Sequence, residues 1–254
     1  MKSTRYVLSL CMILLLALCA APRTAHAQME APEGYASIFN GENFDGWVIP
    51  EGDGGHWKVI DGVIDYDAES EAEGDKSLWT EKDYCDYTLK IDWRLTTVAP
   101  YTNPRVPIIL ADGTHKRDQD GNFMVMSVPD SDSGILPRGH GKAQHNIWNW
   151  PYGSGEVYGY RMDRNQPPEV RRAALPLVNA DKAIGEWNAS KIVVRGKFMT
   201  IRINGQLVID RIYLNEIPDC GPIGLQHHGH KNDAGEWVSP PSLVQFRNIY
   251  VKEH

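Results

Sequence analysis

Two stretches in the middle of the chain alternate polar and aromatic side chains. In residues 142–150, every second side chain is an amide or an indole: Gln144, Asn146, Trp148 and Trp150. In residues 155–161, the alternating side chains are Glu156, Tyr158 and Tyr160. Alternating side chains of an extended strand share one face. Sugars stack their C–H faces on aromatic rings and need amides or carboxylates for their hydroxyls.

The alternative is that these tryptophans belong to the core and that the amides cap turns. A fully buried face would then have to satisfy every amide hydrogen bond inside the protein. Because that requirement is difficult to meet, we favour the interpretation that these side chains form a ligand-binding face made by two neighbouring strands.

Further polar candidates lie on either side of this region. Arg138 ends the segment SGILPR, and its planar guanidinium suits either a ligand oxygen or a surface salt bridge. In residues 221–230, Gln226 and His228 fall on one face of an expected strand, while His227 falls on the other. The histidines leave an acid–base or metal role open, but their spacing matches no zinc signature.

The segment around Asp118 carries oxygen ligands at alternate positions, as calcium loops do. Pro129 stands where such a loop needs its last acid, so a surface loop is the expectation. No nucleotide-binding fingerprint is present. We expect neither a metal nor a cofactor.

The elements that position these residues are expected to be strands. Residues 87–95 alternate apolar and polar side chains, the pattern of a strand with one buried face. Hairpin turns are expected at Asp61-Gly62, Asn204-Gly205 and Gly196-Lys197. No helical periodicity is found beyond the N-terminus, so we predict a single all-β domain, a jelly-roll β-sandwich, over residues 28–254. The irregular stretches 99–107 and 163–186 are expected to rim its binding face.

Residues 1–27 have the features of a signal peptide: a basic start, an apolar run over 6–21 and the cleavage site Ala25-His26-Ala27. The apolar run is too short to span a bilayer, so we expect a soluble protein exported to the periplasm or beyond the cell. Cys85 and Cys220 remain after cleavage, and either a disulfide or two separate thiols is compatible with their spacing.

The charge of the chain narrows the range of partners. The formal net charge of −7 becomes −10 once Lys2, Arg5 and Arg23 leave with the signal peptide. An acidic surface disfavours nucleic acid and anionic lipid, and no stripe of basic residues is apparent that would reverse this average locally. The expected partner is therefore a small carbohydrate, and the oligomeric state is left open.

Several ordered motifs together resemble the 3-keto-disaccharide hydrolase family over nearly the whole of residues 28–254. They are SIFNGENFDGW (37–47), SGILPR (133–138), GEWN (185–188), INGQLV (203–208), GPIGLQHHG (221–229) and QFRNIYVKE (245–253). The resemblance implies a concanavalin-like jelly roll that cleaves glycosides oxidised at carbon 3. It assigns site roles to Arg138, Gln144, His227 and His228. Many members carry a glutamate two residues before that glutamine, whereas this chain has Lys142 there and an acid later, at Glu156.

A ketone at carbon 3 acidifies the proton on carbon 2, so the bond at carbon 1 can break by elimination and water can then add. This chemistry needs a base, a donor for the ketone oxygen and an acid for the leaving oxygen. Our hypothesis is that Glu156 or His228 is the base and that Arg138 stabilises the enolate. The expected substrate-binding residues are Gln144, Asn146, Trp148, Trp150, Tyr158, Gln226 and His227.

Two other functions compete with this hypothesis. A non-catalytic sugar-binding module would use the same tryptophans without forming product. An ordinary sandwich-fold glycosidase needs two carboxylates at a fixed separation, and the ExDxxE strand typical of such enzymes is absent.

Overall fold

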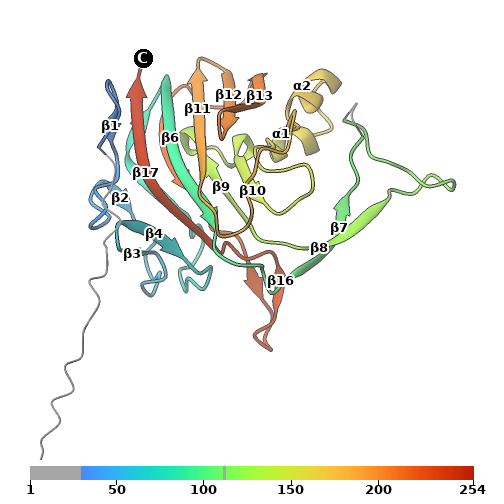
Figure 1. Ribbon diagram of the computed structural model, residues 1–254, viewed down its shortest axis with the longest axis horizontal. Coiled ribbons are helices and arrows are strands. Elements are labelled where there is room, and N and C mark those ends of the chain that lie inside the picture. Colours follow the sequence, from blue (N-terminus) through green and yellow to red (C-terminus); the bar gives the residue numbers. More distant parts are fainter. Residues whose placement is uncertain (1–29, 111–112) are drawn as a thin grey trace, which may run out of the picture.

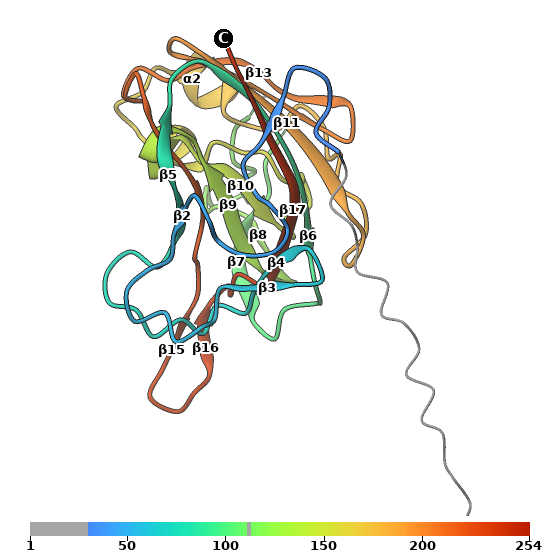
Figure 2. The same ribbon diagram turned by 90° about the vertical axis from the view of Figure 1, so that its left-hand side faces the viewer.

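The computed structural model describes residues 30–110 and 113–254, and its strands form a two-layered sandwich (Figures 1 and 2). The expected signal peptide lies outside the described residues. One layer is an eight-stranded sheet with the order β13-β12-β11-β6-β17-β4-β3, in which β1 pairs with β17; the other has the order β10-β9-β14-β5-β2. The prediction of an all-β jelly-roll sandwich is confirmed.

All strand pairs in the two sheets are antiparallel. The strands of the eight-stranded sheet are β1 (Ala36–Ser37), β3 (Lys58–Ile60), β4 (Val63–Tyr66), β6 (Tyr87–Leu95), β11 (Asn188–Arg195), β12 (Phe198–Ile203), β13 (Gln206–Tyr213) and β17 (Val244–Glu253). Those of the five-stranded sheet are β2 (Trp47–Val48), β5 (Leu78–Tyr84), β9 (Asp132–Leu136), β10 (His145–Trp148) and β14 (Gly221–Leu225). A short hairpin, β15 (His230–Lys231) with β16 (Trp237–Ser239), lies beyond β14.

The core lies between the two sheets. In β6, Leu89, Ile91 and Trp93 are buried, while the residues between them are only partly so, as the alternation predicted. Ile135 and Ile147 of the five-stranded sheet belong to the same hydrophobic cluster. Burial of such side chains is the main favourable term in folding, and here it fixes which face of each strand points inward.

The three predicted hairpin turns are present. Asp61 and Gly62 join β3 to β4 with φ of 51° and 80°, and Asn204 and Gly205 join β12 to β13 with φ of 52° and 82°. Gly196, with φ of 52°, lies in the turn between β11 and β12. These positive φ values are the ones that glycine and asparagine adopt most readily.

Two segments differ from the expectation of strands and loops alone. Residues 155–161 do not form a strand, because the chain turns into helix α1 (Tyr158–Met162), and helix α2 (Pro168–Ala173) follows within the stretch expected to be irregular. In α1, the N–H groups of Tyr160 and Arg161 both donate to the carbonyl of Val157. Spacing of two residues in a helix places Tyr158 and Tyr160 on different sides, so Tyr160 is buried whereas Tyr158 is 40% exposed.

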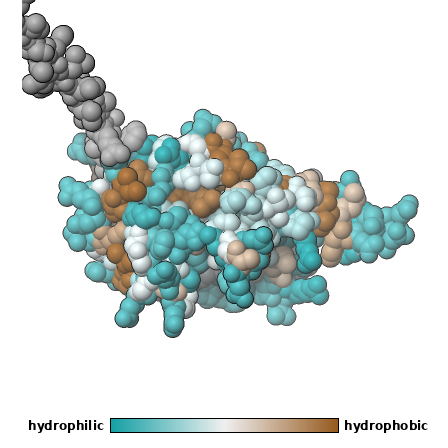
Figure 3. Space-filling view, turned by 90° about the horizontal axis from the view of Figure 1, so that it is seen from below, coloured by the Kyte–Doolittle hydropathy of each residue, from teal (hydrophilic) through white to brown (hydrophobic). Residues whose placement is uncertain are grey.

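The stretch 99–107 also contains regular structure. Strand β7 (Thr102–Pro107) pairs with β8 (Val125–Pro129), and together they carry an arm that projects from the sandwich (Figure 1). The end of this arm is hydrophilic (Figure 3). Among the described residues, no helix has the length and apolar character needed to cross a membrane.

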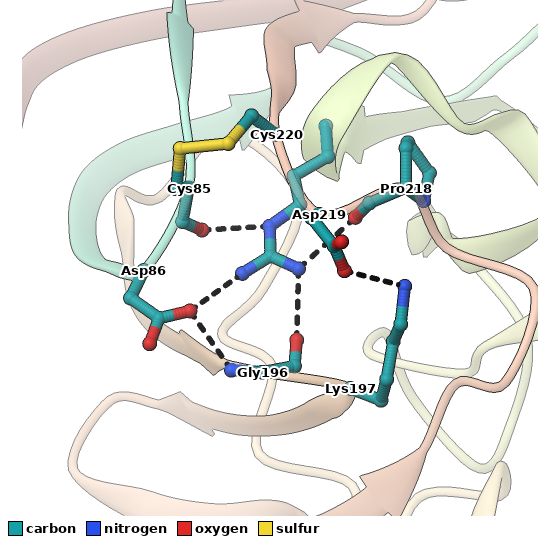
Figure 4. The surroundings of a disulfide bond; sticks show 8 residues. Cys85, Asp86, Gly196, Lys197, Pro218, Asp219 and Cys220 are labelled. Atoms are coloured by element: carbon teal, nitrogen blue, oxygen red, sulfur yellow. Dashed lines mark hydrogen bonds and ion pairs between the residues drawn. A yellow bond between two sulfur atoms is a disulfide. The ribbon is translucent and has the colours of Figure 1, made fainter.

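Cys85 and Cys220 form a disulfide, which decides between the two alternatives left by the sequence (Figure 4). The bridge joins the turn after β5 to the residue before β14, over a separation of 135 residues. Carbonyl and carboxylate groups of Cys85, Asp86, Gly196 and Pro218 gather beside it. This cluster is the binding site of the Arg138 side chain.

Candidate functional site

The candidate site lies on the outer face of the five-stranded sheet, the face turned away from the eight-stranded sheet. Between β9 and β10, Asn146 lies opposite Gly134, and Trp148 lies opposite Asp132. The intervening Ile147 is in the core. Since paired residues of antiparallel strands share a face, Asp132, Asn146 and Trp148 all project outward.

A network of polar side chains covers this face, and we call its members Asp132, Gln144, Asn146, Gln226 and His228 the outer-face network. The Gln144 amide donates to the Gln226 side-chain oxygen at 2.7 Å and to the Ser133 carbonyl at 3.1 Å, and it contacts Asn146. With its nitrogen turned towards acceptors, the Asn146 amide donates to an Asp132 carboxylate oxygen at 2.9 Å. The face is therefore a connected set of hydrogen bonds rather than scattered polar groups.

Two glycines leave space for side chains that lie against the sheet. A Cβ at Gly134 would lie 2.5 to 2.7 Å from atoms of the Gln144 side chain, and one at Gly224 would collide with the Trp79 ring. Neither glycine has a positive φ. Their role is to let side chains lie flat on the sheet, which explains why glycine recurs within these two strands.

Asp132 and His228 form the titratable pair of this network. The Nδ1 of His228 is 2.5 Å from the Pro240 carbonyl, and its Nε2 is 3.8 Å from an Asp132 carboxylate oxygen. A carbonyl only accepts, so Nδ1 carries the proton and Nε2 keeps its lone pair in the neutral ring. Burial raises the pKa of Asp132 to about 7; the nearby Asp130 and Glu156 also raise it, and His228 lowers it.

Glu156 is next to this face but is fully buried. Its carboxylate is paired with the Arg161 guanidinium, and its backbone carbonyl accepts from the Asn146 N–H at 3.1 Å. Burial raises the pKa of Glu156, and Arg161 acts in the opposite direction. A buried, paired carboxylate has no direct access to a ligand, so the geometry does not favour Glu156 as the base.

The predicted aromatic residues form one cluster beside the network. The Trp148 and Trp150 rings stack at 3.7 Å with an angle of 4°, and Tyr158 packs edge-on against Trp148 at 6.1 Å. Trp148 is 3% exposed. The cluster therefore offers Trp150 and Tyr158 to a ligand, while Trp148 supports them from beneath.

Arg138 does not join the site. Its guanidinium is 1% exposed and donates to the carbonyls of Cys85, Gly196 and Pro218 and to the Asp86 carboxylate. Asp132 is the first residue of β9, whereas Arg138 follows the last residue of that strand. Four of its five N–H donors are used by these groups, and the guanidinium is buried, so the expected role in stabilising an enolate has no geometric support.

His227 also points away from the network. Its Nδ1 shares a hydrogen bond of 2.6 Å with the Tyr66 hydroxyl, and burial is the main cause that lowers the pKa of His227 to about 4. Lys142, at the position where the family often has glutamate, is paired with Asp163 and Glu216. These contacts give both side chains structural roles.

Sequence reasoning did not identify Asp132. Its position two residues before Gly134, at an even spacing along β9, was the available signal that it shares the outer face. Among the described residues, no group of three or more histidine, cysteine or acidic side chains is arranged to hold a metal ion.

Comparison with known proteins places this geometry in a family. The model of the 3-keto-alpha-glucoside-1,2-lyase-like domain matches residues 34–252. The chain belongs to this family. The match confirms the resemblance found in the sequence motifs and supports a carbohydrate-active function. None of the curated proteins matches the chain in sequence.

Solved structures resemble this fold at low sequence identity. A candidate glycosyl hydrolase from Parabacteroides distasonis has a TM-score of 0.51 and 17% identity, covering 87% of this chain and 94% of its own. A second from the same organism has a TM-score of 0.47 and 18% identity, covering 87% and 99%. The carbohydrate-binding module CBM66 from Bacillus subtilis has a TM-score of 0.39 and 12% identity, covering 82% and 96%. The first of these supports the sandwich fold.

Proposed function

We propose that this protein cleaves 3-keto-glycosides by elimination followed by hydration on the outer face of the five-stranded sheet. The observation that carries the proposal is the Asp132–His228 pair, in which a carboxyl with its pKa raised to about 7 lies 3.8 Å from an imidazole nitrogen with a free lone pair. A carboxyl whose pKa is raised towards neutral pH is suited to give a proton to a substrate, and an imidazole lone pair is suited to accept one. Family membership supports the proposed substrate class.

In the proposed elimination, His228 Nε2 takes the proton from carbon 2 of the oxidised sugar. The resulting enolate expels the group on carbon 1, and the bond between carbon 1 and the glycosidic oxygen breaks. Asp132, whose pKa burial raises to about 7, gives its proton to the departing oxygen. Water then adds its oxygen to carbon 1 and a proton returns to carbon 2, so the net reaction is hydrolysis.

The enolate oxygen needs a hydrogen-bond donor, and Gln226 is the best placed. Its side-chain oxygen accepts from Gln144, which fixes the amide orientation. Within the described residues, no acceptor is found for its NH2 group. A donor held ready in this way stabilises developing negative charge without reorganisation. Gln144 and Asn146 hold the network together, and Trp150 and Tyr158 are proposed to contact the sugar ring.

The test uses p-nitrophenyl 3-keto-glucoside, with p-nitrophenyl glucoside as the unoxidised control. The wild-type protein should release nitrophenol from the oxidised substrate only. His228→Gln should reduce this rate about 100-fold or more, since a positioned base contributes 10²- to 10⁴-fold. His230→Gln, an exposed histidine two residues away, is the matched control and should keep the rate.

A second measurement separates elimination from ordinary glycoside hydrolysis. In deuterium oxide, product formed through the enolate gains deuterium at carbon 2, which mass spectrometry or NMR detects. Product without deuterium would reject the mechanism, and saturable binding without any product would favour a non-catalytic sugar-binding module. Export is proposed as well: the expected signal peptide and the Cys85–Cys220 disulfide both support an oxidising compartment.

A further inference from the structure

A basic cleft lies between the projecting arm and the two helices. It has a volume of about 900 Å³ and is bounded by arm residues 113–123 and by residues 161–172. Five arginines line it: Arg117, Arg161, Arg164, Arg171 and Arg172. The expectation that no basic cluster reverses the acidic average is wrong here. The arginines come from two separated stretches, and only the folding of the arm over α1 and α2 brings them together.

The positive charge of this basic cleft is largely uncompensated. Glu169 is the acid among its lining residues, and the Arg161 charge is shared with the buried Glu156. Arg171 donates its Nε to the Arg161 backbone carbonyl, and Arg117 donates to the Gly121 carbonyl, so neither bond cancels a charge. In the described part of the chain, Arg164 and Arg172 have no acidic partner. Such a concentration of guanidinium groups attracts anions.

The basic cleft also carries an aromatic platform. Phe123 is 51% exposed, the Arg117 guanidinium lies 4.1 Å from its ring centroid, and the centroid of the His115 ring lies 4.7 Å from that of Phe123. Guanidinium groups bind carboxylate and sulfate oxygens in pairs, and an exposed ring stacks on a sugar. Together these groups fit a sugar that carries an acidic substituent.

Arg161 connects the basic cleft to the candidate site. It lines the cleft and pairs with Glu156, whose backbone carbonyl is bonded to Asn146 of the outer-face network. Tyr158, the exposed aromatic residue of the site, has its ring 5.4 Å from the Arg161 guanidinium. A ligand of more than one sugar unit therefore has charged and neutral binding surfaces next to one another.

We propose that the basic cleft binds an anionic substituent, a carboxylate or a sulfate, on the glycoside that this protein uses. The proposal rests on the proposed function for the identity of the ligand as a glycoside. It adds that the natural substrate is an acidic sugar. Arg164 and Arg172 are the residues proposed to contact the anion, and Phe123 is proposed to contact the sugar ring.

The experiment measures binding by calorimetry, without turnover, so it reports on the basic cleft even if the protein does not cleave 3-keto-glycosides. The probes are trehalose, trehalose with one primary alcohol oxidised to a carboxylate, trehalose 6-sulfate, and sodium sulfate alone. At 50 mM salt, at least one acidic sugar should bind about tenfold more tightly than trehalose and should weaken as salt is raised. The carboxylate and sulfate arms identify which anion is preferred.

Arg172→Glu should weaken binding of the preferred acidic sugar about tenfold or more, because a guanidinium is replaced by a like charge. Arg202→Glu, an exposed arginine on β12 outside the cleft, is the matched control and should leave that affinity unchanged. If Arg172→Glu fails to fold, judged by circular dichroism, Arg164→Gln takes its place. The proposal would be overturned if all three sugars bound equally, or if sodium sulfate bound and none of the sugars did. Equal losses of affinity in the Arg172 and Arg202 variants would also overturn it.

Discussion

Replacing Arg138 tests whether this buried arginine belongs to the fold or to the chemistry. The Arg138→Met substitution keeps most of the side-chain length but removes donors to three carbonyls and to the Asp86 carboxylate. A hydrogen bond to a charged group contributes about 1.5 to 3 kcal/mol, but these bonds share one guanidinium and do not add. Asp86 is 45% exposed and can be solvated by water when its partner is lost.

We therefore expect Arg138→Met to lower the free energy of unfolding by about 3 kcal/mol, because three carbonyl groups lose their donor and an unsatisfied buried polar group costs about 1 to 3 kcal/mol. That is a large part of the roughly 5 to 15 kcal/mol that stabilises a typical domain. Urea unfolding followed by tryptophan fluorescence measures the change. Arg202→Met, on the exposed face of β12, is the control and should change the stability by less than about 0.5 kcal/mol.

The rate of cleavage per folded molecule separates the two roles. If Arg138 acts only in the fold, the turnover measured at a temperature where Arg138→Met is still folded should stay within about threefold of the wild type, since the site groups are elsewhere. A variant that unfolds like the wild type but loses turnover would refute the assignment and return Arg138 to the catalytic machinery.

Two other predictions concern stability. The pKa of Asp132 is raised from 3.8 to about 7 on folding, so its contribution to stability is present at low pH and is lost as pH rises from about 4 to 7. Asp132→Asn should consequently be more stable than the wild type at pH 8, by at most about 4 kcal/mol, although it loses activity. Urea unfolding at a series of pH values measures this difference. Equal stabilities of the two proteins at pH 8 would contradict the prediction. Reduction of the Cys85–Cys220 bridge, which closes a loop with a separation of 135 residues, should lower the free energy of unfolding by up to about 5 kcal/mol on the chain-entropy model. Denaturation with and without reductant measures this loss, and identical midpoints would show that the bridge does not constrain the unfolded chain.

The sequence predicted those features that depend on neighbours along the chain. Asp61-Gly62 and Asn204-Gly205 determine their hairpins locally, because these residues accept the required positive φ. The alternation likewise predicted that Gln144 and Asn146 lie on the same face of the sheet, and their side chains are in contact in the outer-face network. Period-two patterning was reliable wherever a strand was actually formed.

The failures depend on tertiary structure. The motif SGILPR suggested a catalytic role for Arg138, whereas its observed partners include carbonyls from three separate segments, which no local pattern encodes. The aromatic spacing of residues 155–161 resembled a strand, but a helix forms there because the segment packs over Lys142 rather than extending the sheet. Asp132 is the first residue of its strand, so no preceding strand residues show the alternation that would predict which face its side chain occupies. The basic cleft required the arm to fold over the helices.

The position of β17 in the eight-stranded sheet has a consequence for how the protein reaches its native state. Residues 244–253 pair with β6 on one side and with β4 and β1 on the other, so β1 and the β3–β4 hairpin join the rest of the sheet only through this last strand. The eight-stranded layer is therefore completed only when the last strand of the chain is available. Pairing between such distant parts of the chain requires long loops to close first, so we expect this layer to form slowly compared with the local β3–β4 and β12–β13 hairpins.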